Sequence, residues 1–196
     1  MSKELRIEIK RESIEFFLIV NDEDPIEYSI NGNYFYFLDI QFFENTYRVC
    51  TGNTTETNGL ITEFVSEIIE NPESYTTYQV QFCGKEYQMT GEYLLAIILN
   101  ELITSSKNQL EKDEIQQIEV EIMSDDDINV PLIAYLRIKS ALKYIEYDNL
   151  ETYCCYSEDT TSEEENDYEE TVEIMLEEKN QKQYFDEMIK SNRINI

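Results

Sequence analysis

The sequence has no histidine and no tryptophan among its 196 residues, and it has only 5 glycines and 3 prolines. Without histidine, a Ser–His or Cys–His nucleophile pair cannot form. The absence of both histidine and a Cys-x-x-Cys pair also argues against a structural zinc site. Neither GxxxxGK[ST] nor GxGxxG, the two common phosphate-loop motifs, occurs. By motif, the sequence predicts no catalytic residue, no metal site and no cofactor.

Basic residues are scarce, with 15 Lys and Arg against 42 Asp and Glu, and the formal net charge is −27. This charge argues against nucleic-acid binding, which depends on neutralising phosphates with basic side chains. It argues equally against an anionic membrane surface. Two interpretations remain open: the charge serves solubility through self-repulsion, or it forms an acidic surface that attracts a basic partner.

Long apolar runs are absent, since none approaches the roughly 18 residues that a membrane-spanning helix needs. The first residues, Met-Ser-Lys-Glu-Leu-Arg, contain no apolar core of a signal peptide. We therefore expect a cytoplasmic protein, in which cysteines stay reduced. The four cysteines are interpreted as buried thiols of the core: Cys50, Cys83, Cys154 and Cys155.

The first 50 residues alternate short apolar runs with turn-forming residues. Leu5–Ile9 alternates at period two, which predicts a strand with one buried face. Ile14–Val20 is a more continuous apolar run, as expected of a strand buried on both faces. Asn21–Pro25 predicts a turn, and Asn31-Gly32-Asn33 predicts a hairpin turn. Further strands are expected at 26–30, 34–40 and 47–50.

The clearest pattern in the chain lies between Tyr78 and Met123. Tyr78–Phe82 and Glu86–Met89 predict two strands joined by a tight turn at Cys83-Gly84-Lys85. Thr90 is the predicted N-cap of a helix that reaches about Gln109. A further strand is expected at 115–122. The apolar residues of the helix share one face at helical spacing: Leu94, Leu95, Ile98, Leu99, Leu102 and Ile103.

Two more helices and one more strand complete the main part of the chain. Residues 60–70 have helical spacing, and a helix at 130–146 carries Pro131 in its first turn, where the missing N–H is harmless. Residues 151–156 predict a strand. Strands followed by alternating helices and strands predict an α/β fold with a mixed sheet of about five strands and packed helices.

The composition changes after residue 156. Residues 1–156 are predicted to form one domain, and residues 157–170, rich in Ser, Thr, Asp and Glu, an acidic disordered loop. Residues 171–196 are predicted to contain a charged helix, running from Glu173 to Ser191. Its few apolar anchors are Met175, Leu176, Phe185, Met188 and Ile189.

Two local clusters allow a functional reading beside a structural one. Asp125-Asp126-Asp127 offers oxygen ligands for a hard cation, but it lacks the spaced ligands, the glycine and the final glutamate of a calcium loop. Acidic residues before a helix also favour its dipole, which favours a solvated turn. The aromatic residues of Tyr34–Phe37 and Phe42-Phe43 are able to stack on a ligand, yet their strand spacing favours the core.

The order of elements resembles the first lobe of the actin-like ATPase domain in seventy-kilodalton heat-shock chaperones. The stretch Phe82–Leu99, FCGKEYQMTGEYLLAIIL, is similar to the Gly-Lys hairpin and Thr-Pro-Glu-Glu helix start of that family. Ile118–Ile122 takes the place of its Val-Thr-Val-Pro-Ala strand, and Leu5–Val20 that of its first hairpin. The resemblance covers about residues 4–160. It implies an ATPase-lobe fold with a small capping subdomain.

The departures from the family pattern fall on its phosphate-binding positions. The first phosphate loop, Asp-Leu-Gly-Thr-Thr, corresponds to Glu8-Ile9-Lys10-Arg11-Glu12, which lacks the glycine and both threonines. The helix at 60–69 has no lysine in the place of the catalytic one. Glu158 stands where the family has a catalytic glutamate, but Asp159 replaces the following proline. The second phosphate loop, Asp-Leu-Gly-Gly-Gly, has no counterpart. Only Glu8, Ser13 and Glu158 retain groups suited to nucleotide or magnesium.

These observations lead to three hypotheses. The first is a degenerate, chaperone-like nucleotide-binding fragment without ATPase activity, which acts as a protein-binding or scaffold module. The second is an acidic interaction protein that engages basic partners such as histones through residues 157–170. The third is a residual ATP-binding protein that uses Glu8, Ser13 and Glu158. The first is preferred; it expects a protein partner and leaves the oligomeric state open.

Overall fold

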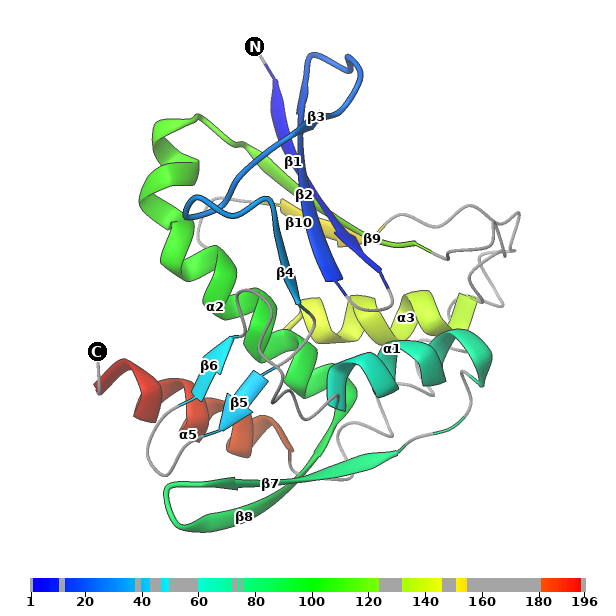
Figure 1. Ribbon diagram of the computed structural model, residues 1–196, viewed down its shortest axis with the longest axis vertical. Coiled ribbons are helices and arrows are strands. Elements are labelled where there is room, and N and C mark those ends of the chain that lie inside the picture. The colour runs from blue at the N-terminus through cyan, green and yellow to red at the C-terminus, as the bar shows by residue number, and fades with distance from the viewer. Residues whose placement is uncertain are drawn as a thin grey trace.

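The computed structural model describes residues 2–10, 13–37, 40–42, 47–49, 60–71, 74, 76–123, 132–145, 151–154 and 181–194. These residues form a mixed α/β structure, with a main sheet at one end and three helices beside it (Figure 1). Two small hairpins and the C-terminal helix lie at the other end (Figure 1). The predicted α/β class is confirmed.

The main sheet is mixed and is centred on the first strand. β1 (Lys3–Ile9) pairs antiparallel with β2 (Ser13–Val20) and parallel with β9 (Gln117–Ile122). β10 (Glu151–Cys154) pairs parallel with β9 and forms one edge. β3 (Ile26–Glu27) and β4 (Phe35–Phe37) both pair antiparallel with β2 on the opposite side. The order β10-β9-β1-β2-β3 confirms the predicted five-strand mixed sheet.

β3 and β4 are two parts of one interrupted edge strand. Leu18 of β2 pairs with Ile26, and the Tyr28 N–H donates to the Phe16 carbonyl at 2.9 Å. The next residue of β2, Glu15, pairs with Phe35. No residue of β2 is skipped, so residues 29–34 loop out of a continuous ladder. We call residues 29–34 the excursion.

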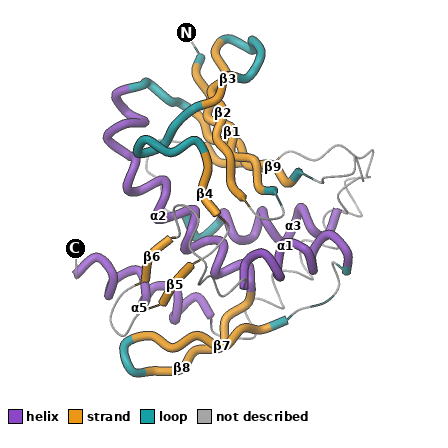
Figure 2. The backbone as a smooth tube through the Cα atoms, in the orientation of Figure 1, coloured by secondary structure: helices purple, strands orange, loops and turns teal. Residues whose placement is uncertain are grey.

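The excursion folds toward the long helix α2 (Gly91–Lys112) and is fastened to it (Figure 2). Gln109 donates from Nε2 to the Ser29 carbonyl at 2.7 Å, and its Oε1 accepts from the Asn31 N–H at 3.1 Å. A tight turn closes the excursion, with Ile30 and Asn33 exchanging both backbone hydrogen bonds. Asn31 and Gly32 have φ of 50° and 81°, as a type I′ turn requires.

The predicted turn at Asn31-Gly32-Asn33 is therefore present, but its flanking strands differ from the prediction. The expected hairpin would pair residues 26–30 with residues 34–40. Instead β3 and β4 each pair with β2, and Ile30 and Asn33 form only an isolated bridge. A local turn signal does not determine which strand its neighbours join.

The two faces of the main sheet differ in chemistry. On one face Leu5, Ile7 and Ile9 of β1 are fully buried, together with Ile118 and Val120 of β9. The other face carries charged side chains, so the interpretation of β2 as buried on both faces is wrong: Glu15 and Phe17 are only half-buried. We call this the charged face; its charged residues are Glu4, Arg6, Glu8, Lys10, Glu15, Glu119 and Glu121.

The helix α2 is the centre of the molecule. Its predicted apolar face is confirmed, and Thr90 occupies the N-cap position, although its side chain makes no cap hydrogen bond. Every residue from Gly91 to Asn100 is buried. A helix buried all round has neighbours on all sides: α1 (Leu60–Glu70), α3 (Leu132–Leu142), α5 (Gln181–Ile194) and β8 (Lys85–Thr90).

Two small hairpins and α5 form the end away from the main sheet (Figure 1). β5 (Ile40–Phe42) pairs with β6 (Tyr47–Val49), and β7 (Thr77–Phe82) pairs with β8. α5 packs on β8 and α2, and the predicted anchors Phe185, Met188 and Ile189 are buried. Met175, Leu176 and the predicted loop at 157–170 lie outside the described residues.

Several smaller predictions are corrected or limited. Cys83 is exposed at the tip of the β7–β8 hairpin, not buried in the core, because it occupies a two-residue turn with φ of 51°. The aromatics Tyr34 and Phe35 are exposed, whereas Tyr36 is buried. α3 ends at Leu142, before the predicted Glu146. Asp125–Asp127 lies outside the described residues. None of the helices described is both long and apolar enough to span a membrane.

Candidate functional site

The carboxyl ends of the parallel strands β1 and β9 are the first place to search for function, because open α/β sheets bind ligands there. At this end, Glu8 of β1 is the register partner of both Glu15 on β2 and Glu121 on β9. Three glutamates thus lie in one row across three strands of the charged face. Directly opposed like charges repel each other, so this row requires a compensating cation.

Lys10 supplies that cation from the end of β1. Its Nζ lies 2.6 Å from Glu15 Oε2 and 3.8 Å from Glu8 Oε2. The backbone of Lys10 also donates to the Ser13 carbonyl at 2.8 Å, which closes the hairpin end. The ammonium group of Lys10 is therefore shared between two carboxylates of the protein.

A second row of charged residues lies two positions further from the carboxyl ends of β1 and β9. Arg6 Nε donates to Glu119 Oε2 at 3.0 Å and lies 3.9 Å from Glu121 Oε2. Glu119 is only 4% exposed, so this contact is screened little by solvent. Burial by itself would lower the pKa of Arg6, but the hydrogen bond to Glu119 and the nearby carboxylates hold that pKa above its ordinary value.

Glu121 has an elevated pKa. Burial disfavours its charged form and is the largest cause; Glu119 and Glu8 raise the pKa further, while Arg6 lowers it. The electrostatic potential at this edge of the sheet is thus already negative. Five carboxylates and two cations on the charged face leave an excess of negative charge there, which repels phosphate groups.

The structure brings two of the three predicted nucleotide-binding residues to one place. Glu8 and Ser13 flank the β1–β2 turn; Ser13 contributes its backbone carbonyl, and Glu8 faces Lys10. Glu158, Arg11 and Glu12 lie outside the described residues. Nowhere in the described ranges do three or more Cys, Asp or Glu side chains form a group that could hold a metal ion.

Sequence reasoning missed the compensating partners at this edge. Period-two alternation places Glu8 and Lys10 on the same face of β1. That signal identifies the face of each side chain within a strand. It does not identify Glu121 as a neighbour, because the β1–β9 pairing joins residues more than 100 positions apart.

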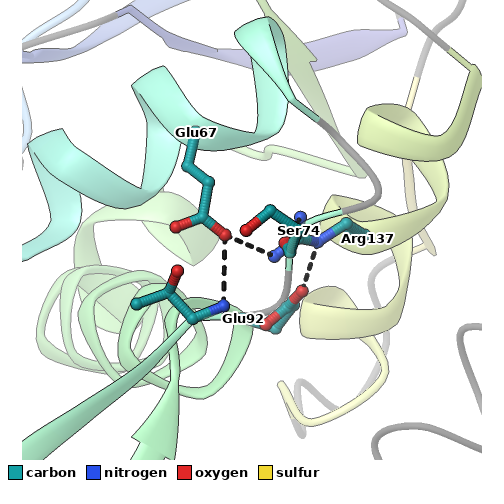
Figure 3. Close-up of polar contacts among 5 residues, drawn as sticks. Glu67, Ser74, Glu92 and Arg137 are labelled. Carbon is teal, nitrogen blue, oxygen red and sulfur yellow. Dashed lines mark hydrogen bonds and ion pairs between the residues drawn. The ribbon is translucent and has the colours of Figure 1, made fainter.

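A second ionisable cluster lies between the three helices (Figure 3). Arg137 of α3 is 1% exposed and donates from Nε to Glu92 Oε1 at 2.5 Å. Its Nη1 donates to the Ser74 carbonyl at 2.8 Å, and its Nη2 lies 3.9 Å from Glu67 Oε1. The guanidinium carbon also lies 5.2 Å from the centre of the Phe64 ring. We call these residues the helix junction.

The helix junction has the geometry of a structural tie. It joins α1, α2 and α3 (Figure 3). Glu67 Oε1 also accepts the Thr76 N–H at 3.2 Å, next to the start of β7. Arg137 and Glu92 are both buried, so no ligand reaches them without opening the helices. In the sequence, Glu67, Glu92 and Arg137 lie in three separate helical segments, and no local spacing indicates that they pair.

No protein-family model matches the sequence, and a comparison with curated proteins finds no match either.

Proposed function

We propose that this chain is a non-catalytic, chaperone-like relative of the actin-like ATPase lobe, and that it acts as a protein-binding or scaffold module. The resemblance implies a mixed five-strand sheet with a small capping subdomain. The sheet order β10-β9-β1-β2-β3 supports the first part. The separate hairpins β5–β6 and β7–β8, grouped with α5 beyond the helices, support the second (Figure 1).

The observation that carries the proposal is the pairing of Lys10 with Glu15 and Glu8 at the β1–β2 hairpin end. In the resemblance, this end corresponds to the first phosphate loop. A phosphate-binding loop offers backbone N–H groups and cations. Here the Lys10 N–H is used by the Ser13 carbonyl, and the Lys10 ammonium is used by carboxylates. Both groups that would contact phosphate already have protein partners.

The remaining surface favours protein binding over small-molecule chemistry. The net charge of −27 disfavours nucleic acid and anionic membranes, and large apolar side chains are exposed at the β3–β4 edge. The exposed, unpaired thiol of Cys83 is consistent with a reducing compartment such as the cytoplasm.

Isothermal titration with Mg-ATP tests the proposal. We expect no binding tighter than about 1 mM, which corresponds to about −4 kcal/mol. Micromolar binding to the full chain would overturn the proposal. The variant E158Q then identifies a residual nucleotide site: if Mg-ATP binds and E158Q abolishes binding, the residual ATP-binding hypothesis is correct.

A matched variant tests whether the pairing of Lys10 with Glu8 and Glu15 prevents phosphate binding. The double substitution E8Q/E15Q removes both carboxylates from Lys10 while leaving the side-chain volumes nearly unchanged. We expect inorganic phosphate to leave the thermal midpoint of the wild type unchanged and to raise that of E8Q/E15Q. An equal response of both proteins would show that the Lys10 pairing does not govern anion binding.

A further inference from the structure

The large exposed apolar side chains of the described residues lie at one edge of the main sheet. Ile26 is 61% exposed, Tyr34 is 56% exposed and Phe35 is 49% exposed. Ile26 and Phe35 belong to the two parts of the edge strand, and Tyr34 ends the excursion between them. Exposed apolar residues that are scattered singly need no explanation, but a group at a sheet edge indicates a contact surface.

The edge offers backbone groups as well as side chains. The Tyr28 N–H points toward β2, where it donates to Phe16. In an antiparallel ladder the direction of the backbone groups alternates along the strand, so the N–H and C=O of Glu27 point away from β2. Among the described residues, no further strand pairs with the outer side of β3.

The excursion does not block this edge. It turns toward α2 and is held there by Gln109 and Ser105, so it leaves the path of the sheet (Figure 2). Tyr28 and Phe35 pair with consecutive residues of β2, Phe16 and Glu15. An incoming strand therefore meets a ladder whose spacing is continuous across the excursion.

The exposed side chains of Ile26 and Phe35 are spaced so that one extended peptide can contact both. Ile26 pairs with Leu18 and Phe35 with Glu15, so they are three ladder positions apart, about 10 Å at roughly 3.3 Å per residue. Leu18 and Glu15 point to opposite faces, and so do Ile26 and Phe35. Residues i and i+3 of an extended peptide also point to opposite faces about 10 Å apart, so one strand can contact both.

The negative charge at this edge favours a basic partner. Residues 21–37 contain four acidic residues and no Lys or Arg, and all four acids are exposed: Asp22, Glu23, Asp24 and Glu27. A second copy of the chain would bring the same four acids to the contact and add to the repulsion of a net charge of −27. A basic segment is complementary to this edge.

We propose that the outer side of β3, continued by Tyr34 and Phe35, binds an extended segment of a partner protein in which apolar residues stand three positions apart and basic residues lie between them. The segment adds a strand to the sheet: its backbone pairs with the N–H and C=O of Glu27, its apolar side chains contact Ile26 and Phe35, and its basic side chains face the acids of residues 22–27. This inference rests on the proposed function, because it specifies the site and class of the bound protein.

The experiment uses the full chain and a short synthetic peptide in which every third residue is valine and the others are lysine. The control peptide has the same residues with N-methyl groups at alternate backbone nitrogens, which keeps the charge and blocks strand pairing. The variant E27P removes the outward N–H without removing a hydrogen bond to β2, and E27Q removes only the charge. We expect E27P to weaken binding about tenfold relative to E27Q, as for the loss of one hydrogen bond.

Matched charge variants separate the edge from the acidic segment at 157–170. D22N/E23Q/D24N and E163Q/E164Q/E165Q each remove three negative charges. We expect the first triple variant to weaken peptide binding at least about threefold and the second to leave it nearly unchanged. Amide exchange at Glu27 should slow on binding in the wild type, and protection of the Tyr28 N–H, which bonds to the Phe16 carbonyl, shows that each variant is folded.

Three results would overturn the inference. They are the absence of peptide binding, equal binding of the N-methylated and unmodified peptides, and equal effects of the two triple variants. None of them alters the outcome of the Mg-ATP titration, so failure of this inference is distinguishable from failure of the proposed function.

Discussion

Glu92 Oε1 and Arg137 Nε are 2.5 Å apart, and neither side chain is more than 1% exposed. This ion pair connects the first turn of α2 to the middle of α3. The other carboxylate oxygen, Glu92 Oε2, has no hydrogen-bond partner within the described structure. Two buried charges are costly to desolvate, and their mutual attraction offsets that cost only while both are present.

Removing one partner of this pair is therefore expected to be more harmful than removing both. We expect R137M to lower the free energy of unfolding by about 3–5 kcal/mol, because it leaves Glu92 buried and unpaired. The double variant E92Q/R137M should lose less than R137M alone, because it leaves no unpaired buried charge. Urea unfolding of the four proteins in a double-mutant cycle measures the coupling.

The exposed pair of Lys107 and Glu111 on α2 provides the control. It has a separation of 3.9 Å and the i,i+4 spacing, and K107M should cost less than about 1 kcal/mol. If R137M costs no more than K107M, the helix junction is not the tie that its geometry indicates.

Gly91 is expected to tolerate no side chain. A Cβ atom at this position would overlap the Phe64 ring, which lies directly against the start of α2. We expect G91A to lower the free energy of unfolding by about 1–3 kcal/mol through overpacking. The cost should be smaller in an F64A background, where the ring is absent. A cost that is the same in both backgrounds would exclude the Phe64 contact as its cause.

Gln109 is expected to hold the excursion in place. Its side chain bonds to the Tyr28 hydroxyl, the Ser29 carbonyl and the Asn31 N–H. We expect Q109A to cost about 1–3 kcal/mol and to speed amide exchange at residues 29–34 while leaving the β1–β2 pairing protected. The exposed neighbour Glu111 is the control, since E111A should leave exchange in the excursion unchanged.

The raised pKa of Glu121 predicts a pH-dependent variant effect. The folded state binds the Glu121 proton more tightly than the unfolded chain, whose ordinary value is 4.5. The stabilisation from this proton is complete below pH 4.5 and is lost as the pH rises through the higher folded pKa. E121Q should therefore raise the free energy of unfolding, compared with the wild type, more at pH 7 than at pH 4.

The size of this effect should stay below about 1 kcal/mol, because Glu121 is partly exposed and solvent screens its interactions. Thermal unfolding of E121Q and wild type at the two pH values measures it. A stability difference independent of pH would contradict the assigned cause. E114Q, which changes an exposed carboxylate beyond the end of α2, is the control.

Local patterns predicted most elements of this fold. Period-two alternation predicted β1, β7 and β9, and helical spacing predicted α1 and α2. These patterns succeed because each element must bury one face, and the spacing of its apolar residues records that need. The turn at Asn31 and Gly32 was equally predictable from the sequence, because few residues accept a positive φ.

The candidate site was predicted only in part. Glu8 and Ser13 were singled out through the family resemblance, but the partners that occupy Lys10 and surround Glu8 were not. The same limit applies to Arg137 and Glu92, whose positions in the chain are 45 residues apart. Charged side chains carry no periodic signal of their partner, since pairing depends on which elements come together.

The amino-acid sequence by itself determined most strands and helices, the buried faces of most of them, and the strong negative charge. Only the tertiary structure decided that β3 and β4 form one edge strand, that Lys10 is neutralised by Glu15 and Glu8, and that Ile26 and Phe35 stay exposed. The physical reason is the separation along the chain. Burial of a face is a local property of an element, whereas strand pairing and charge compensation depend on residues that are distant in the chain.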